Sequence, residues 1–368
     1  MKKHSRTTVS PKRGQSTQPK DIAAIGIDLG DRNSRYCMIG GSGEIVAEGS
    51  VATTSKAMGG MFAVVPGCRI ALEVGTHSPW VSRLLAGLGH EVTVANAREL
   101  KAITASSRKS DALDARMLAR LVRADRELLR PIRHRGEQAQ AHLLKIRVRA
   151  ALVEARTALI NAARGLVKAA GERLPDCDAD QMRPAQAAGL PAWLSAQIQP
   201  LLEQVEQLSA QMNRCDREIE QIARNQYPET KLLEQIRGVG TLIALTFVLT
   251  VEEPQRFARS RDVGCYVGLR PRQSQSGERN PQLGITKEGD VYLRKLLVQG
   301  AHRILSRRAP DTDLKRWGLK LSRRGGSNAK KRAVVAVARK LAVLLHRLWV
   351  GGEVYEPLRN SAGMQMAA

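Results

Sequence analysis

The segment AAIGIDLG, residues 23–30, decides the fold class of the N-terminal part of this chain. It is an apolar run closed by a glycine, which is typical of a buried strand. RYCMIG and EIVAEGSVA, separated by the turn GGSG, predict two more strands, and CRIALEV and HEVTVAN predict a fourth and a fifth. A helix over residues 79–88 and a helix-rich stretch over residues 98–129 complete the pattern. This order predicts a mixed sheet in an α/β domain spanning residues 21–130.

Two long apolar repeats with helical spacing follow within residues 131–228, separated by a segment that contains Pro175, Pro184, Pro191 and Pro200. The apolar residues of the first repeat are Val148, Leu152, Ala155, Leu159, Ala162, Leu166 and Ala169. Those of the second are Leu201, Val205, Leu208, Met212, Cys215, Ile219 and Ile222. The heptad spacing predicts a long antiparallel helical hairpin or a dimerising coiled coil, and two ordinary core helices would be the simpler alternative.

Residues 229–350 predict a mainly helical C-terminal domain. The stretch LLEQIRGVGTLIALTFVLT reads as a helix, a tight turn and an apolar helix, which is the form of a helix-hairpin-helix element. In such a turn Gly238 and Gly240 would let backbone N–H groups approach a phosphate, although an ordinary turn between two helices has the same pattern. We expect a disordered basic tail at residues 1–20, which has six Lys or Arg and no acid, and a frayed tail at residues 351–368.

The composition indicates a polyanionic partner. Lys and Arg number 59 against 35 Asp and Glu, for a formal net charge of +24. There is neither an apolar run long enough to span a bilayer nor an apolar stretch behind the basic N-terminus, so we expect no membrane partner and a cytoplasmic location. The five scattered cysteines predict reduced thiols rather than disulfides or a zinc site. Aromatic residues are 3% of the chain, which argues against a base-stacking platform.

The C-terminal helices carry the most one-sided charge. Between residues 301 and 347 there are fourteen Lys or Arg and two acids. The densest cluster is Arg323, Arg324, Lys330, Lys331 and Arg332. A solvated helix face is the plain interpretation, but such an excess of one sign would repel itself without a polyanion. We therefore expect this cluster to bind phosphates.

Four acidic residues stand out at the predicted ends of elements in the N-terminal domain. Asp28 ends the first strand and Glu73 ends the fourth, whereas Asp111 and Asp114 lie three apart in RKSDALDARMLARL, on one face of a helix. Taken singly, each has a structural explanation, such as a turn, a helix cap or a surface ion pair. Taken together, they are a set of oxygen donors suited to Mg²⁺ or Mn²⁺, which can assist phosphodiester cleavage.

The polar stretch GLRPRQSQSGERNPQLGITKEG predicts a loop in which two serines lie among basic residues. Ser274 and Ser276 are the serines, and the nearby cations are Arg270, Arg272, Arg279, Lys287 and Arg294. Guanidinium groups can hold a phosphate and offset charge in a transition state, so a serine here is a possible nucleophile. However, the sequence shows no activating base beside it, and a Ser-Gly pair in a loop is commonly just a turn.

These motifs together resemble one family. GIDLGDRNS, ALEVGTHSPW and RKSDALDARMLARL, followed by IRGVGTLIALTFVLTVEEPQRF and VGLRPRQSQSGERNPQLGITKEGDVYLRKLLVQGA, are similar to the insertion-sequence transposases with an Asp-Glu-Asp-Asp motif, the one-hundred-ten family. The resemblance covers about residues 22–350. It implies a RuvC-like N-terminal domain of RNase H fold, and a C-terminal domain that supplies a nucleophilic serine.

The resemblance also implies particular residues and partners. The acidic motif falls on Asp28, Glu73, Asp111 and Asp114, and the family's serine falls on Ser276, with Ser274 as the fallback. The family implies a noncoding bridge RNA that pairs with donor and target DNA, and a homo-oligomer, dimer or tetramer. A metal-dependent junction resolvase or nuclease without a catalytic serine is the alternative enzyme. A basic nucleic-acid packaging protein is the non-enzymatic alternative.

Overall fold

A computed structural model of the chain describes residues 22–96, 110–277, 279, 281 and 283–359. The chain divides into two compact units, one ending at His134 and the other beginning at Arg135. The expected basic tail at residues 1–20, the first part of the helix-rich stretch and the end of the C-terminal tail lie outside the described residues. No helix among the described residues is long and apolar enough to cross a membrane.

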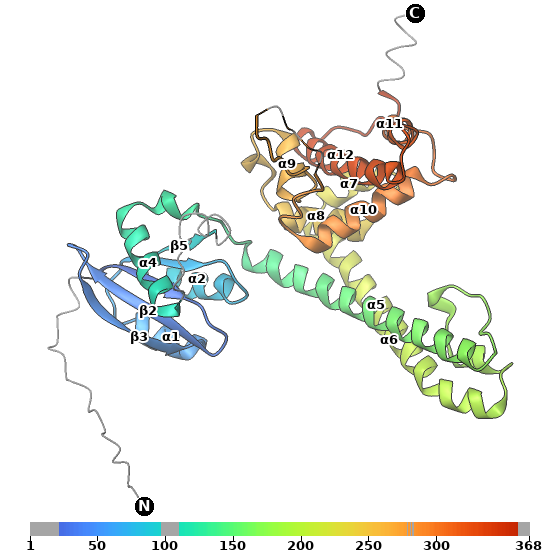
Figure 1. Ribbon diagram of the computed structural model, residues 1–368, viewed down its shortest axis with the longest axis horizontal. Helices are drawn as coiled ribbons and strands as arrows, with labels where there is room; N and C mark the ends of the chain where they lie inside the picture. Colours follow the sequence, from blue (N-terminus) through green and yellow to red (C-terminus); the bar gives the residue numbers. More distant parts are fainter. Residues whose placement is uncertain (1–21, 97–109, 278, 280, 282, 360–368) are drawn as a thin grey trace, which may run out of the picture. The chain divides into compact units, whose positions relative to one another are not determined.

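The N-terminal unit is built on a five-stranded mixed sheet with the order β3-β2-β1-β4-β5 (Figure 1). The strands are β1 Ile22–Asp28, β2 Asn33–Gly40, β3 Ile45–Ala52, β4 Arg69–Glu73 and β5 Glu91–Ala95. The first three strands pair antiparallel as a meander, and β4 and β5 continue the sheet parallel to β1. All five strands therefore fall where the sequence predicts them.

Helices cover both faces of this sheet. On one face α1 (Ser55–Phe62), which the sequence did not predict, and α2 (Ser78–Gly87) close a core around Ile25, Ile27 and Phe62. On the other face α4 (Asp111–Ala124) packs over a second core of smaller side chains. The short 3-10 helix Arg126–Leu129 follows α4. The predicted α/β architecture is confirmed for the N-terminal unit.

The C-terminal unit begins with a long antiparallel hairpin of α5 (Glu137–Ala169) and α6 (Ala192–Gln226). Paired side chains step in opposite directions along the two helices, from Gln138 with Gln226, through Arg149 with Asp216, to Arg156 with Ser209. Residues 170–191 connect the helices, with 3-10 turns at Ala179–Gln181 and Pro184–Ala187, and form a small core at the far end of the hairpin.

Two details of the hairpin correct the expectation from sequence. The predicted stripe on α5 is wrong, because Val148 and Leu166 are 48% and 54% exposed, whereas Ile146, Ile160 and Val167 face α6. Pro200 does not precede the second helix but lies inside α6. Burial of Leu194, Ile198 and Leu202 on both sides of the proline outweighs the single backbone hydrogen bond that a proline removes.

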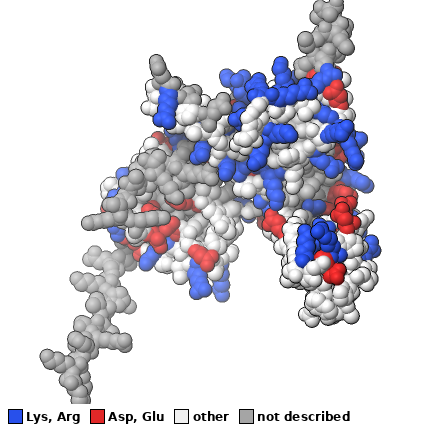
Figure 2. Space-filling model, turned by 45° about the vertical axis from the view of Figure 1, so that its right-hand side comes forward, with Lys and Arg blue, Asp and Glu red and all other residues white. Residues whose placement is uncertain are grey.

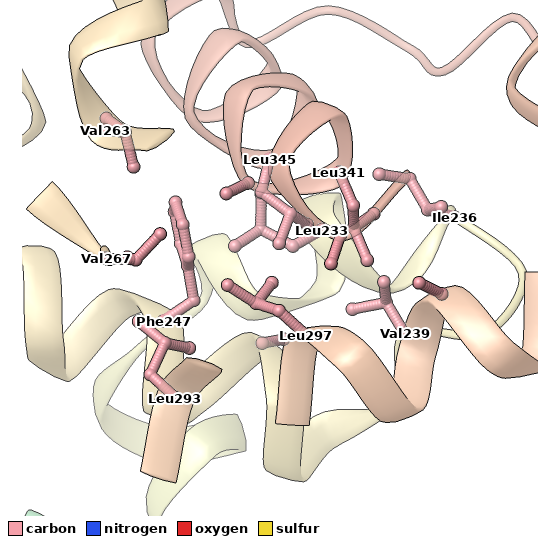
Figure 3. Close-up of a cluster of buried hydrophobic side chains, with 14 of the residues drawn as sticks. Leu233, Ile236, Val239, Phe247, Val263, Val267, Leu293, Leu297, Leu341 and Leu345 are labelled. Atoms are coloured by element: carbon pink, nitrogen blue, oxygen red, sulfur yellow. The ribbon is translucent and has the colours of Figure 1, made fainter. Parts of the chain in front are cut away.

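The remaining helices form a compact bundle around an apolar core (Figure 3). They are α7 Glu229–Glu234, α8 Thr241–Val251, α9 Ser260–Tyr266, α10 Val291–Leu305, α11 Asp313–Ser322 and α12 Ala329–Gly351, with a 3-10 turn at Pro254–Arg256. Helix α8 is almost wholly buried and contacts both the bundle and the base of the hairpin. The hairpin base and the bundle therefore share packing within one unit.

Candidate nucleic-acid cleavage site

The register of the sheet places Asp28 and Glu73 side by side. Parallel strands β1 and β4 align Ile27 with Leu72, so the next residue on each strand is Asp28 or Glu73. Both acids are partly buried. Parallel strands end at the same edge of a sheet, so two carboxylates meet at the carboxyl end of β1 and β4.

Alternation along the strands turns both acids toward α4. Ala24 and Ala71 lie in the core beneath α4, and side chains two residues apart on a strand point to the same face. Gly26 lies so close to α4 that a Cβ there would collide with the carbonyl oxygen of Ala115. Two residues further along, Asp28 follows Gly26 on β1 and Glu73 follows Ala71 on β4, so both acids lie on the face that α4 covers.

Helix α4 brings the other two acids to the same end of the sheet. The face of α4 that meets the sheet carries Ala115 and Leu118, and Asp111 and Asp114 lie one turn before them on the same face. Near the other end of α4, Arg123 donates to the carbonyl of Gly41, just after β2 and beside the start of β1. The first turn of α4 therefore lies where β1 and β4 end.

We call Asp28, Glu73, Asp111 and Asp114 the acidic edge. Their oxygen-only donor set, assembled from three elements, fits a hard divalent cation such as Mg²⁺ better than a softer metal. Like charges at one edge also need a counter-charge. Among the described residues, however, no three acidic, histidine or cysteine side chains are close enough together to hold one ion. The side chains share an end and a face without forming a closed coordination shell.

Polar contacts fix the surroundings of the acidic edge. His77, in the loop after β4, accepts a hydrogen bond from Trp80 Nε1 at Nδ1 and lies 3.7 Å from Asp31. Arg116 of α4 forms a two-pronged ion pair with Glu48 of β3, and its guanidinium holds the pKa of that carboxyl below the usual value. This ion pair joins α4 to the edge strand β3 of the sheet.

Two of the five cysteines, Cys37 and Cys68, are buried. All five are free. Burial raises the pKa of the Cys37 thiol to about 11, with a further contribution from Glu48, and burial raises the pKa of Cys68 to about 11. These two thiols are therefore un-ionised near neutral pH and are core residues rather than reactive groups.

The predicted loop that contains the serines folds back on itself in two arms, and we call its described residues, 268–277, 279, 281 and 283–287, the ribbon. Backbone hydrogen bonds join Arg272 N to Gly284 O, Thr286 N to Arg270 O, and Lys287 N to Gly268 O. At the tip, Ser276 and Arg279 exchange both of their backbone hydrogen bonds, each 3.1 Å long. Among the described residues of this segment no regular strand forms, and Pro271–Ile285 and Ser276–Arg279 are isolated bridges, so the segment is a loop as the sequence predicts.

Ser276 lies at the exposed tip of the ribbon, directly opposite Arg279. The tight turn between them contains Gly277 at φ +56°, a conformation that glycine adopts without strain. Arg270 and Arg272 lie on the first arm and are also exposed, and Ser274 lies between Arg272 and the tip. The ribbon therefore presents one serine with a guanidinium group on the opposing residue.

The foot of the ribbon is fastened to the bundle. Gly268 and Gly289 have positive φ and pack against backbone atoms that a side chain would displace. Arg294 of α10 donates to the carbonyls of Val267 and Glu288, at 3.0 and 2.6 Å. The Asp290 side chain is only 5% exposed, caps α10 and forms an ion pair with Arg147 of α5.

These contacts change the interpretation of one predicted binding residue. Arg294 is turned toward the backbone at the foot of the ribbon, so we assign it to positioning rather than to direct phosphate contact. Lys287 is one of three non-glycine residues with positive φ among those described, and it is exposed at the same place. Sequence patterns identified the charges of these residues but not their orientation.

The turn between α7 and α8 is anchored on the core. Ile236 and Val239 are buried and point into the cluster shown in Figure 3. Gly238 has φ +103° and packs against Gly300 of α10, where a Cβ would lie 3.2 Å from the Gly300 carbonyl oxygen. Of the two glycines in this turn, Gly240, the residue before α8, is the one with open space around it. Close packing thus explains Gly238 without a phosphate.

The predicted basic cluster lies where α11 ends and α12 begins. Arg323 and Arg324 follow α11, and the remaining members, Lys330, Lys331 and Arg332, lie in the first turn of α12, where there is no acid. All five are exposed. Cations in the first turn oppose the helix dipole, so an anion would stabilise them. Figure 2 shows many Lys and Arg side chains on the visible face of the C-terminal unit.

One further hollow has different chemistry. A groove of about 410 Å³ lies between α11, α12 and residues 353–359, lined by Trp317, Val343 and Leu344 among others. It contains none of the four acids and neither serine. We therefore assign it no part in cleavage.

The N-terminal unit, a mixed five-stranded sheet with helices on both faces, is an RNase H-like domain. Comparisons with known families agree. Residues 25–171 match a family described as "Transposase" with the DEDD designation, and residues 230–317 match the "Transposase IS116/IS110/IS902 family".

Proteins described as transposases are similar to this chain along most of their length. The chain is 29% identical to the "Transposase for insertion sequence element IS1111A" of Coxiella burnetii, over 96% of each protein. It is 29% identical to a "Probable family 20 transposase" of Pseudomonas aeruginosa, over 80% of this chain and 88% of that protein. The chain belongs to the IS116/IS110/IS902 family of transposases and is a DNA transposition enzyme. The packaging-protein alternative is therefore excluded.

Proposed function

We propose that this transposase cuts and rejoins DNA with the acidic edge and Ser276 as its two chemical groups. The observation that supports the proposal is the placement of four acidic residues, on β1, β4 and α4, at one end and one face of the sheet. If each acid were only a turn residue, a helix cap or a surface ion-pair partner, there would be no reason for all four to lie at the same place. The four are Asp28, Glu73, Asp111 and Asp114.

The acidic edge would hold Mg²⁺ or Mn²⁺. A bound divalent cation would supply a Lewis acid that polarises the phosphodiester and neutralises charge as the strand breaks. The protein's own contribution is to fix the carboxylates on rigid elements, with Asp28 and Glu73 at adjacent strand ends. A rigid set of donors loses little conformational freedom when a cation binds.

Ser276 would be the nucleophile. Its Oγ would attack phosphorus, the bond from phosphorus to the leaving sugar oxygen would break, and the serine proton would be lost as that oxygen is protonated. DNA would then be joined to the protein through a phosphoserine bond, which the reverse reaction resolves. The exposed tip of the ribbon and the adjacent Arg279 support this role, because a guanidinium can offset charge on the attacked phosphate.

A denaturing gel tests the serine. Protein, guide RNA and end-labelled DNA are incubated with Mg²⁺ and then denatured with detergent, and labelled protein is measured. We expect a labelled adduct with the wild type and with Ser274→Ala, and none with Ser276→Ala or without divalent metal. Cleavage without any adduct, or an adduct that persists in Ser276→Ala, would favour the metal-dependent nuclease without a catalytic serine.

The partners would be donor DNA, target DNA and the noncoding bridge RNA that the family resemblance implies, in the cytoplasm. The basic cluster at α11 and α12 supports a polyanionic partner, because its five cations are exposed and meet no acid in the first turn of α12. Sequencing of RNA that copurifies with the protein tests the guide. Recovery of RNA from the region flanking the gene is expected, and recovery of unrelated cellular RNA would contradict it.

We also propose that the protein self-associates through the outer face of α5. Apolar residues not used by the hairpin recur there with heptad spacing, among them Leu144 at 64% and Val148 at 48% exposure. Met212, in contrast, is buried within the hairpin, so it is not available to a second chain. Val148→Asp should lower the oligomeric state measured by light scattering, and an unchanged mass would contradict this surface.

A further inference from the structure

Arg256 is held in an unusual way for an exposed arginine. Its guanidinium carbon lies 4.8 Å from the ring centre of Phe257 and 4.4 Å from that of Tyr266. The two rings are 5.4 Å apart and inclined at 64°, so the guanidinium fits into the corner between them. Two cation–π contacts fix the side chain before any ligand arrives.

The rings that hold Arg256 are themselves fixed. The Tyr266 hydroxyl donates to the carbonyl of Thr250 at 3.1 Å. Phe257 also packs edge-on against His346, which is 2% exposed and donates from Nε2 to the carbonyl of Pro254 at 2.8 Å. The turn that carries Arg256 is thus tied to the buried face of α12.

The guanidinium of Arg256 remains available to bind an anion. Stacking uses the face of a guanidinium and leaves its N–H groups directed outward in the ring plane. Arg256, Arg259 and Arg261 are all exposed, and none forms an ion pair with a carboxylate in the described part of the chain. Three unpaired guanidinium groups within six residues are suited to an anion with several oxygens.

The position of Arg256 relates it to the ribbon. Tyr266, whose ring carries Arg256, also presents its backbone carbonyl to Gly289 at the foot of the ribbon. The ribbon extends from this foot to Ser276 over about eight residues, or roughly 25 Å at ~3.3 Å per residue. A nucleic-acid strand lying along the ribbon would therefore reach Arg256 several nucleotides away from the scissile phosphate.

We propose that Arg256 is a phosphate-binding residue for DNA that lies along the ribbon, with Arg259 and Arg261 extending the same site. This inference rests on the proposed function only in taking DNA as the partner of the ribbon. Arg256 contacts the backbone of the DNA, sets its position relative to the ribbon and takes no part in the chemistry at Ser276. Its contribution is to affinity and to the salt dependence of binding.

Fluorescence anisotropy with a labelled duplex, at several salt concentrations, tests the proposal on the full-length protein. Arg256→Gln should weaken binding about tenfold and reduce the slope of log affinity against log salt by about one. Arg256→Lys should keep the slope but lose several-fold in affinity, because lysine lacks the planar fork. Phe257→Leu should weaken binding with the slope unchanged, since a ring is lost but no charge.

Arg316→Gln is the matched control. It removes one exposed arginine from the same unit, but Arg316 is already paired with Asp311 at 2.6 Å, so its loss should change the slope less. Unfolding midpoints identify any variant that fails through stability. Equal slopes for Arg256→Gln and the wild type, or for Arg256→Gln and Arg316→Gln, would overturn the proposal. Absence of wild-type binding would overturn the DNA-binding proposal as well.

Discussion

The acidic edge and the ribbon carry the two halves of the proposed chemistry, and they are held in different ways. The acids lie at the ends of a buried sheet and on a helix packed against it, so strand register and side-chain alternation determine their positions. Ser276 lies at the tip of an exposed ribbon whose two arms are joined by a few backbone hydrogen bonds. Only its foot is fixed, through glycine packing and Arg294.

In the proposed chemistry, one enzyme combines a rigid group with an adjustable one. A metal site requires donors that hold their geometry before the ion binds, and packed elements supply it. A nucleophile that must reach a phosphate and later release it needs an exposed mount, and exposed segments with few buried contacts open most easily. Substitutions in the acidic edge should therefore change the cleavage rate or global stability. Substitutions in the ribbon should change adduct formation and local opening.

Removal of an acidic ligand should have the largest effect. Asp28→Asn or Glu73→Gln should slow DNA cleavage by at least about 100-fold, because several kcal/mol of transition-state stabilisation by metal would be lost. Folding and duplex binding should change little, since one charge among a net +24 is altered. Gel assays of cleavage and anisotropy of binding measure the two properties.

Asp31→Asn is the matched control for these acids. Asp31 is near the same end of β1, but its side chain is 95% exposed. Cleavage at the parental rate is expected for this variant. Parental cleavage by Asp28→Asn would show that the acidic edge is not a metal site.

A pair of glycine substitutions compares how tightly the backbone is packed in the two regions. Gly26→Ala should destabilise the N-terminal unit by about 3 kcal/mol, because the methyl group would collide with the backbone of α4. Gly277→Ala should cost only about 1 kcal/mol, since φ is +56° but nothing lies within 4 Å. Denaturant unfolding of the full chain measures both, and similar losses would contradict the contrast between rigid and exposed mounts.

Loosening the foot of the ribbon should give an intermediate effect on chemistry. Arg294→Gln removes a guanidinium that holds two carbonyls, so adduct formation should fall about tenfold while the unfolding midpoint hardly moves. Faster proteolysis within the ribbon is the readout of local opening. Lys295→Gln, at an exposed neighbour paired with Glu154, should have neither effect. Unchanged proteolysis in Arg294→Gln would show that Arg294 does not hold the foot of the ribbon.

The smallest effect concerns pH and the pair of Glu48 with Arg116. The guanidinium lowers the pKa of Glu48 in the folded chain below the ordinary value of 4.5, so this pair stabilises the fold above that pH. The contribution is lost as pH falls through the lowered pKa, where the carboxyl takes up a proton. Glu48→Gln should therefore be less stable than the wild type at neutral pH and equal to it in acid. A difference that persists in strong acid would contradict the assignment.

Much of the N-terminal unit could be predicted from sequence, because its signals are local. Apolar runs ended by glycine predict the strands, and Asp28 and Glu73 stand where those runs stop. Helical spacing puts Asp111 and Asp114 on one face without knowledge of the fold. Only the tertiary structure decides that β1 and β4 are neighbours and that α4 runs so that its first turn meets their ends.

The C-terminal unit is where sequence determined least. Apolar residues at heptad spacing occur on two faces of α5, and composition alone does not say which face meets α6. The polar ribbon shows no periodicity, so Ser276 opposite Arg279 appears only once the backbone hydrogen bonds are known. Charge counts found the basic residues, but the stacking of Arg256 on two rings comes from contacts across residues 256–266. Local patterns determine the elements and their chemistry, whereas contacts between distant residues decide which groups meet.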